Sequence, residues 1–213
     1  KETITDTTVQ EKNITYPTDD KLHKKIIKRC QKIAEDESIE LRQSYKRTLK
    51  QLSIDQRHRN HPKNKSKAKK ADRKVKTIAG RLVREIQRKL NANSKHMVEL
   101  QNMHKVLAQK RTDKNKIYSL QEPEVYCISK GKEHKKYEFG NKVSIMSTKN
   151  SGVIVAAKSF QNEYDGHTLE KTIEQQKRLT NHQVQATYVD RGYRGITELL
   201  GTKVYSPKVK STD

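Results

Sequence analysis

The sequence predicts an α/β protein whose core is interrupted by a long all-α insertion. Apolar residues between about 21 and 110 recur at helical spacing, whereas segments from residue 124 onwards alternate polar and apolar side chains as strands do. A strand-like segment also precedes the helical region, so both ends of the chain are expected to build one core. We therefore expect three parts: a first strand and loop in residues 1–20, a helical arm in 21–115, and the rest of the core in 116–213.

The N-terminal segment, ETITDTTVQ at residues 2–10, carries Ile4 and Val9 among threonines and predicts a short strand. A loop follows it. Asp19 and Asp20 then precede a helical pattern, where carboxylates are favourable because the N-terminal end of a helix is positive.

The helical arm has two periodic stretches separated by a basic one. Between about 21 and 53, apolar residues follow one another at steps of mostly three, four or seven, which predicts an amphipathic helix. The stretch RHRNHPKNKSKAKK at 57–70 is basic and nearly without aliphatic residues, so it is either a flexible linker or the exposed tip of a helical hairpin. A second helical pattern over 75–107 completes an antiparallel arm.

The remaining segments predict the core. EVYCIS at 124–129 is a strand, and KYEFGNKVSIM and GVIVAAKSF form a hairpin around TKNSG, the second of these strands being the more fully buried. A helix at 165–181, a strand at 183–190, a short helix in ITELL and a short strand in TKVYSP follow. The order strand, hairpin, helix, strand, helix, strand matches a ribonuclease H-like α/β core interrupted by the insertion.

Composition narrows the class of protein. The chain has 213 residues, a formal net charge of +22 and only 31% hydrophobic residues, and so large a positive charge favours a polyanionic partner. Cys30 and Cys127 are far apart, which argues against a zinc knuckle and against a disulfide-stapled secreted module. No apolar run reaches the roughly 20 residues of a membrane span and no signal peptide is visible, so we expect no membrane partner and a cytoplasmic, nucleoid-associated protein. The start at Lys1 rather than Met suggests a segment of a longer protein.

Two acids stand out by position. Asp6 lies within the first predicted strand, and Asp190 ends the strand QATYVD, before the glycines of RGYRG. In a ribonuclease H-like sheet these two strands are neighbours, so the carboxylates can meet. Two close carboxylates repel each other unless a cation lies between them, and their oxygen atoms suit magnesium. In two-metal chemistry such ions activate an attacking water or 3′-hydroxyl and stabilise the leaving oxygen.

Several longer strings carry a family resemblance: DTTVQEKNITYPTDDKL, KIYSLQEPEVYCISKGKEHKKYEFGNKVSI, YDGHTLEKTI and YVDRGYRGI. They resemble DDE transposases of the fifth bacterial insertion-sequence family, across nearly the whole chain. The resemblance implies cut-and-paste transposition, with double-stranded DNA as partner at terminal inverted repeats and target, and a homodimer assembled on DNA. It implies that Asp6 and Asp190 are the first two catalytic aspartates and hold Mg2+ or Mn2+. The third acid, a Glu on a later helix, has no counterpart before Asp213, and the N-terminal DNA-binding region is missing, so we expect the chain alone to be inactive.

Further DNA contacts are expected close to these acids. One basic cluster surrounds an aromatic pair and is expected to contact the phosphate backbone, the alternative being a solvated strand edge protected by lysines: Lys130, Lys132, His134, Lys135, Lys136 and Lys142. Directly after the second aspartate, a phosphate or flipped-base contact is expected from Arg191, Tyr193 and Arg194. The alternative is that Arg191 pairs with a neighbouring carboxylate.

Other candidates have simpler explanations. A capping turn explains Asp165, Gly166 and His167 better than a catalytic histidine does. Residues 57–89 contain fourteen basic side chains and predict electrostatic DNA binding without sequence readout, unless they form a merely solvated arm. A second class of function also stays open: a non-enzymatic basic protein that coats nucleic acid, whose activities Asp→Asn changes would leave intact.

Overall fold

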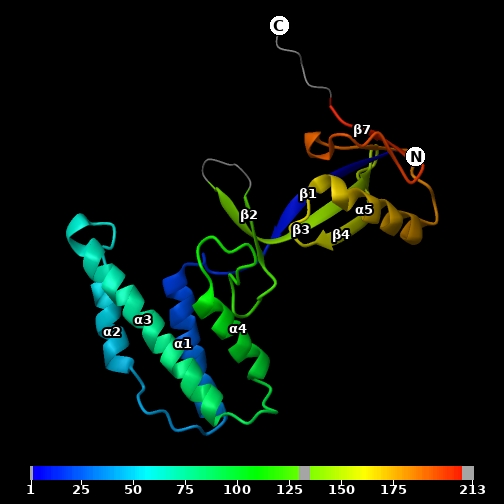
Figure 1. Cartoon of the computed structure of the whole chain (residues 1–213). Coiled ribbons are helices and arrows are strands. Elements are labelled where there is room, and N and C mark those ends of the chain that lie inside the picture. Colours follow the sequence, from blue (N-terminus) through cyan, green and yellow to red (C-terminus); the bar gives the residue numbers. More distant parts are fainter. Residues whose placement is uncertain (1, 130–134, 208–213) are drawn as a thin grey trace. The chain divides into compact units, whose positions relative to one another are not determined.

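The computed structural model describes residues 2–129 and 135–207, which divide into two compact units (Figure 1). Residues 14–125 form one, called the helical unit. The described residues of 1–13 and 126–213 form the other, called the sheet unit. The protein is therefore an α/β protein, with a mixed sheet built from both ends of the chain.

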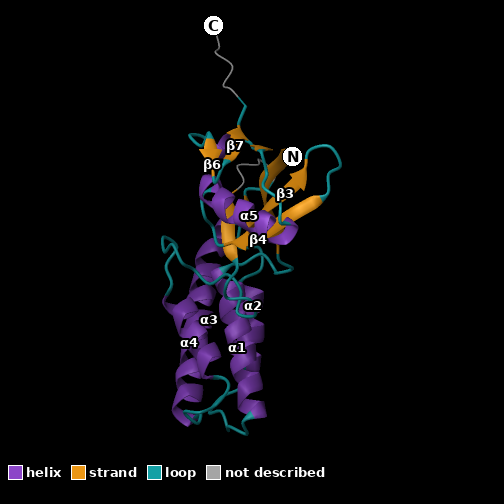
Figure 2. Cartoon of the chain, turned by 90° about the vertical axis from the view of Figure 1, so that its right-hand side faces the viewer, coloured by secondary structure: helices purple, strands orange, loops and turns teal. Residues whose placement is uncertain are grey.

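The helical unit is organised around its longest helix, α3. This helix contacts each of the other three, and Figure 2 shows them lying side by side. Apolar positions three or four residues apart on α3, such as Val75, Ile78 and Leu82, are fully buried against α1 and α4. The bounds are α1 Asp19–Asp36, α2 Lys46–Asp55, α3 Pro62–Lys89 and α4 Met97–Ala108.

The prediction of one helix over 21–53 is wrong. The helix ends at Asp36 and another begins at Lys46, with left-handed backbone at Ser38 (φ 52°) and Tyr45 (φ 55°). The segment between still packs Ile39 and Leu41 against the core, so the apolar spacing continues where the backbone is not helical.

The basic stretch 57–70 had two possible interpretations, and the first of them, a flexible linker, is wrong for most of its length. It is helical from Pro62, because proline is well suited to the first turn of a helix.

The sheet unit contains a seven-stranded mixed sheet. β3 pairs antiparallel with β1 along one side and with β2 and β4 along the other. β1, β5 and β7 are mutually parallel, and β6 returns antiparallel to β7. The bounds are β1 Glu2–Glu11, β2 Tyr126–Ser129, β3 Tyr137–Thr148, β4 Ile154–Phe160, β5 Ala186–Tyr188, β6 Glu198–Leu199 and β7 Thr202–Tyr205.

One helix, α5 (Asp165–Thr180), covers one face of this sheet over β3 and β4 (Figure 2). Met146, Leu169 and Ile173 are fully buried between them. Hydroxyl groups complete this small core, since Thr5 and Thr187 are buried and their Oγ1 atoms lie 2.8 Å apart across β1 and β5. Because side chains alternate along a strand, the neighbours of Thr5 in β1, Ile4 and Asp6, point to the opposite face of the sheet.

Two predictions for the sheet unit are wrong. Residues 196–200 were expected to be helical, but Glu198–Leu199 is a strand, joined to β7 by a tight turn with positive φ at Leu200 and Gly201. The second hairpin strand was expected to be the more fully buried one, but Ile154 is 62% exposed because α5 covers only one face.

Two further features concern the whole described chain. Cys30 and Cys127 lie in different units and neither forms a disulfide. Across residues 2–129 and 135–207, every helix is too short or too polar to traverse a bilayer.

Candidate functional site

The register of the parallel pair β1–β5 brings the two predicted acids to the same end of adjacent strands. Ile4 and Tyr188 are partners across these strands. Asp6 lies two residues after Ile4, and Asp190 two residues after Tyr188. Residues two apart share a face of a strand, so Asp6 lies with Ile4 on the face away from α5. Asp190 lies just after the end of β5 and begins the turn Arg191–Tyr193.

Each of these aspartates is exposed and forms a local hydrogen bond. Oδ1 of Asp6 accepts the backbone N–H of Thr7 at 2.7 Å. Oδ1 of Asp190 accepts the N–H of Gly192 at 2.8 Å, which caps the 3-10 turn Arg191–Tyr193. The turn therefore fixes where the second carboxylate can lie.

A third carboxylate, Asp165 at the first residue of α5, lies on the face of the sheet that α5 covers, close to Asp190. Its Oδ1 accepts the hydroxyl proton of Thr7 at 2.7 Å and a proton of Lys142 Nζ at 2.8 Å. A Cβ atom on Gly192 would lie 2.8 Å from Asp165 Oδ2 and 2.9 Å from Asp190 Oδ1, so both carboxylates lie close to this glycine.

The expectation that Asp165 caps its helix is therefore wrong. The cap position is Tyr164, which makes no side-chain capping bond, and the carboxylate of Asp165 binds the sheet instead. Sequence reasoning missed this role because an Asp before a helical pattern is sufficiently explained as a cap.

Tyr193 does not offer a stacking face to DNA, contrary to the prediction. Its side chain is completely buried in the core of the sheet unit. Burial raises the pKa of its hydroxyl to about 12, and the charges of Asp165 and Asp6 act in the same direction. The hydroxyls of Thr168 and Ser144 lie near enough to oppose this rise, although neither forms a hydrogen bond of good geometry with the phenol.

Three of the lysines that were predicted to contact DNA have interaction partners within the protein. The Lys142 side chain is 13% exposed and binds Asp165 and the carbonyl oxygen of Glu163, so it is a positioning group rather than a free phosphate contact. Lys135 forms an ion pair with Glu11. Lys136 lies 5.8 Å from the centre of the Tyr137 ring. Lys130, Lys132 and His134 lie outside the described residues.

Arg191 and Arg194, in contrast, are exposed beside Asp190. Within the described part of the chain, neither forms an ion pair, so the alternative that Arg191 pairs with a carboxylate has no support in this structure. Both arginines remain candidates for phosphate contact.

The face of the sheet away from α5, which carries Asp6, also carries an aromatic pair that the sequence did not predict. Tyr188 and Tyr205 stack with their ring centres 5.4 Å apart, and Lys149 Nζ lies 4.0 Å from the centre of the Tyr188 ring. Tyr205 is 48% exposed. The missed signal was alternation, because Tyr188 follows the buried Thr187 and so lies on the opposite face of the strand.

The carboxylates of Asp6 and Asp190 are suitable ligands for a divalent cation, but two carboxylates do not complete its coordination. Carboxylate oxygens of Asp6 and Asp190 are the ligands that magnesium and manganese prefer. Asp165 is neutralised by Lys142. Among the residues that the structure describes, no group of three or more His, Cys, Asp or Glu side chains is placed to hold a metal ion.

Comparison of the chain with models of protein families, with curated proteins and with solved structures found no match.

Proposed function

We propose that the chain is part of the catalytic region of a DDE transposase, in which the sheet unit is a ribonuclease H-like core and Asp6 and Asp190 take part in phosphoryl transfer. The observation that carries the proposal is the parallel pairing of β1 with β5, because it brings these two acids to the same end of adjacent strands although the helical unit lies between them in sequence. The strings around both acids resemble the same transposase family, so position and sequence pattern agree.

The strand order supports the proposed core. The sequence β4, β3, β1, β5, β7, in which β3 is antiparallel to β1 and the last three strands are parallel, is the arrangement expected of a ribonuclease H-like sheet. The helix between the hairpin and β5 crosses one face, as a connection between parallel strands must.

Asp6 and Asp190 would hold Mg2+ or Mn2+ together with ligands outside this pair. Such an ion polarises the scissile phosphate and lowers the pKa of a bound water. The chain's own contribution is positional: the Gly192 N–H orients Asp190, and the hydrogen bond from Thr7 to Asp165 ties β1 to α5 beside Asp6. Exposed Arg191 and Arg194 supply positive charge where DNA phosphates would lie.

The first experiment measures binding of Mn2+ to the full 213-residue chain by selective broadening of amide NMR signals. Broadening centred on β1 and the residues after β5 is expected, and it should disappear in Asp6→Asn and in Asp190→Asn. Asp113→Asn is the matched control, because Asp113 is an exposed turn residue bonded to the Lys110 N–H. Broadening that is unchanged in Asp6→Asn would overturn the metal assignment.

The second experiment addresses transposition itself. In a full-length transposase that contains this segment, Asp6→Asn is expected to abolish excision of the element while DNA binding persists. Normal excision by that variant would refute the catalytic role.

The alternative is a non-enzymatic basic protein that coats nucleic acid, and the large number of exposed basic residues on α3 favours it as the second candidate. It predicts that substitutions of Asp6 and Asp190 change nothing, whereas loss of α3 cations weakens binding. DNA binding alone is common to both proposals, so the aspartate variants distinguish them.

A further inference from the structure

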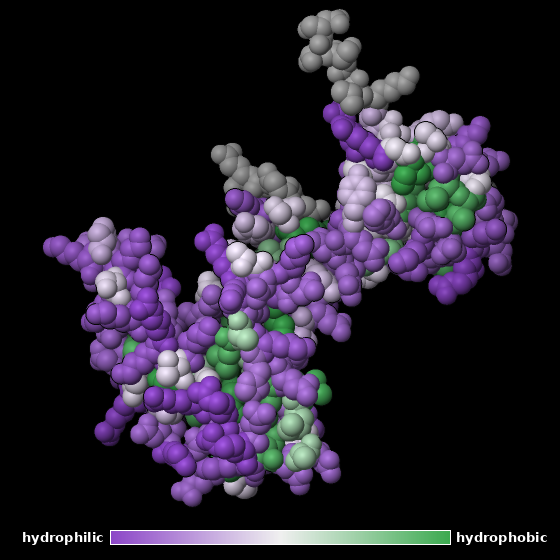
Figure 3. Space-filling model, in the orientation of Figure 1, coloured by the Kyte–Doolittle hydropathy of each residue, from purple (hydrophilic) through white to green (hydrophobic). Residues whose placement is uncertain are grey.

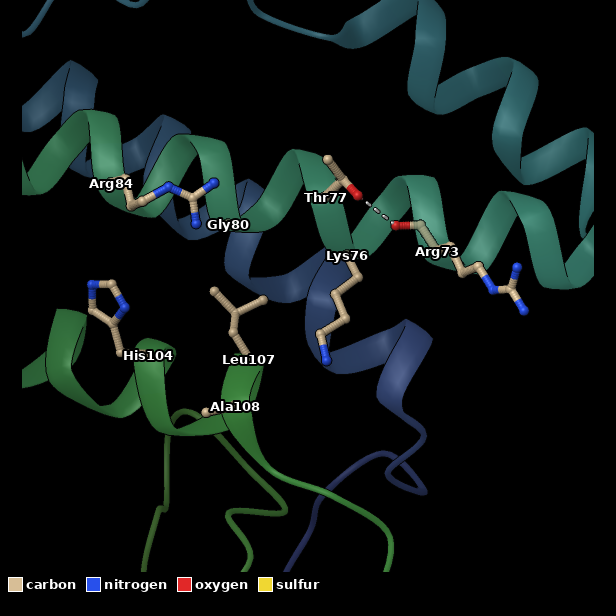
Figure 4. A pocket seen from close by; sticks show the side chains of 8 residues that line it. All are labelled: Arg73, Lys76, Thr77, Gly80, Arg84, His104, Leu107 and Ala108. Atoms are coloured by element: carbon tan, nitrogen blue, oxygen red, sulfur yellow. Dashed lines mark hydrogen bonds between the residues drawn. The ribbon is translucent and has the colours of Figure 1, made fainter.

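A groove of about 600 Å³ runs between α3 and α4 in the helical unit (Figure 4). Its α3 side is lined by Arg73, Lys76, Gly80 and Arg84, and its α4 side includes His104 and Leu107. The α3 residues follow helical steps of three or four, so they lie along one side of the helix.

Every charged residue that lines the groove is cationic. Its lining contains two arginines and one lysine but no Asp or Glu. All three cations are exposed, and in the described part of the chain none of them forms an ion pair, whereas Lys67 and Lys89 on the same helix are paired with Asp55 and Glu85. Figure 3 shows that the visible surface of this unit is mainly hydrophilic. An anion is therefore the ligand that this groove can bind without displacing an internal partner.

The positive charge continues across the ridge of α3. Arg73 and Arg84 also line hollows on the α2 side, where Arg81 joins them. Arg73 and Arg84 are eleven residues apart, which is about 16 Å along a helix. A row of cations of this length matches an extended polyanion rather than a single small anion.

Gly80 has a specific role in the groove. Glycine within a helix costs about 0.5–1 kcal/mol relative to alanine. Here a Cβ atom would lie 3.2 Å from Nη1 of Arg84, so the missing side chain leaves space for the guanidinium to lie against α3. Figure 4 shows Arg84 extending along the helix toward Gly80, beside His104. Gly80 thus leaves room for the Arg84 side chain at the cost of a weaker helix.

We propose that this groove binds the phosphate backbone of duplex DNA through Arg73, Lys76 and Arg84, with Gly80 positioning Arg84. The inference rests on the proposed function for the identity of the polyanion. It assigns the contact to one face of one helix, separate from the acids of the sheet unit.

The test measures affinity of the full chain for short DNA duplexes of unrelated sequence, by fluorescence anisotropy over a range of KCl concentrations without divalent ions. The triple change Arg73→Gln, Lys76→Gln, Arg84→Gln is expected to weaken binding to all duplexes alike. It should also reduce the slope of log affinity against log salt by about three, roughly one for each cation.

The matched control removes the same charge elsewhere, by changing Lys89, Lys149 and Lys171 to Gln, because each of these is paired with a glutamate. Its salt slope should stay near the original. If the two triple variants bind equally, the groove is not the site. An RNA duplex that displaces the DNA at lower concentration would overturn the choice of DNA.

A second variant, Gly80→Ala, tests the proposal even if the triple variant does not fold. It is expected to leave the melting temperature unchanged or raise it, yet to weaken DNA binding because Arg84 is displaced. Unchanged affinity would refute the positioning role. These outcomes are separate from those that test the proposed function, which fails if Asp6→Asn leaves Mn2+ binding and excision unchanged, whatever the groove variants do.

Discussion

Thr7 donates its hydroxyl proton to Asp165 over 2.7 Å, joining the strand that carries Asp6 to the first turn of α5. Lys142 of β3 binds the same Asp165 oxygen at 2.8 Å. One carboxylate thus connects three elements beside the candidate site. It is this contact, rather than a capping turn, that fixes the end of α5 against the sheet.

Replacing Asp165 with Asn is expected to destabilise the protein by about 1–3 kcal/mol, because Lys142 would keep its charge in a mostly buried place without a charged partner. The measurement is the free energy of unfolding in urea. Glu163→Gln is the control, since its pair with Lys171 is exposed and long at 3.9 Å, and it should change stability by less than about 1 kcal/mol. Equal effects would contradict the structural role of Asp165.

Gly192→Ala tests the candidate site without altering any acid. The new Cβ atom would lie less than 3 Å from oxygens of Asp165 and Asp190, so both carboxylates must shift from their present positions. Binding of Mn2+ is expected to weaken roughly tenfold or more, as for other changes that reorient metal ligands. Arg191→Ala is the neighbouring control and should retain the ion. Undiminished Mn2+ affinity in the glycine variant would show that Gly192 does not position the site.

Tyr193→Phe distinguishes a core tyrosine from a DNA-binding one. The buried hydroxyl has no well-formed hydrogen bond, so its removal should change stability by no more than about 1 kcal/mol, and DNA affinity should stay the same. Tyr193→Ala, in contrast, should cost about 3–5 kcal/mol because it leaves a large cavity. Thermal unfolding of both variants provides the measurement, and loss of DNA binding in the phenylalanine variant would contradict this interpretation.

Burial raises the pKa of the Cys30 thiol from 9.0 to about 12, within the core of the helical unit. Because the folded pKa is the higher one, its contribution to stability is complete below about pH 9 and is lost as pH rises toward 12. We expect iodoacetamide at pH 8 to alkylate the half-buried Cys127 but not Cys30 in the folded protein. Mass spectrometry of digested protein reads both sites, and fast labelling of Cys30 would show that the unit opens readily.

The fold was predicted best where local pattern is sufficient. Alternation identified β3 within a residue or two of its bounds, and a helical pattern with acids early and bases late identified α5. Apolar spacing could not reveal the break after Asp36, because Ile39 and Leu41 reach the same core from a non-helical segment. Nor could it predict the strand Glu198–Leu199, which exists because it pairs with β7.

The candidate site was predicted in part. Asp6 and Asp190 were identified by their places in the strand pattern, and the pairing of β1 with β5 brings them to the same end of adjacent strands, while their catalytic role stays a prediction. Asp165 and Gly192 could not be identified, because their roles depend on contacts between elements distant in sequence. The burial of Tyr193 was missed for the same reason, since a tyrosine after a strand can equally point to solvent or into the core.

The chain leaves the sheet after Glu11, the last residue of β1, and returns to it at Tyr126, the first residue of β2. Both residues pair with Gly140 of β3, one on each side of that strand. These two points flank a single strand and are therefore separated by two strand spacings, about 10 Å. A short glycine-serine bridge can span that gap. Excising residues 14–125 and closing the gap would remove none of the strand pairings, so the length of the intervening segment is free to vary by insertion or deletion while the two acids keep their register.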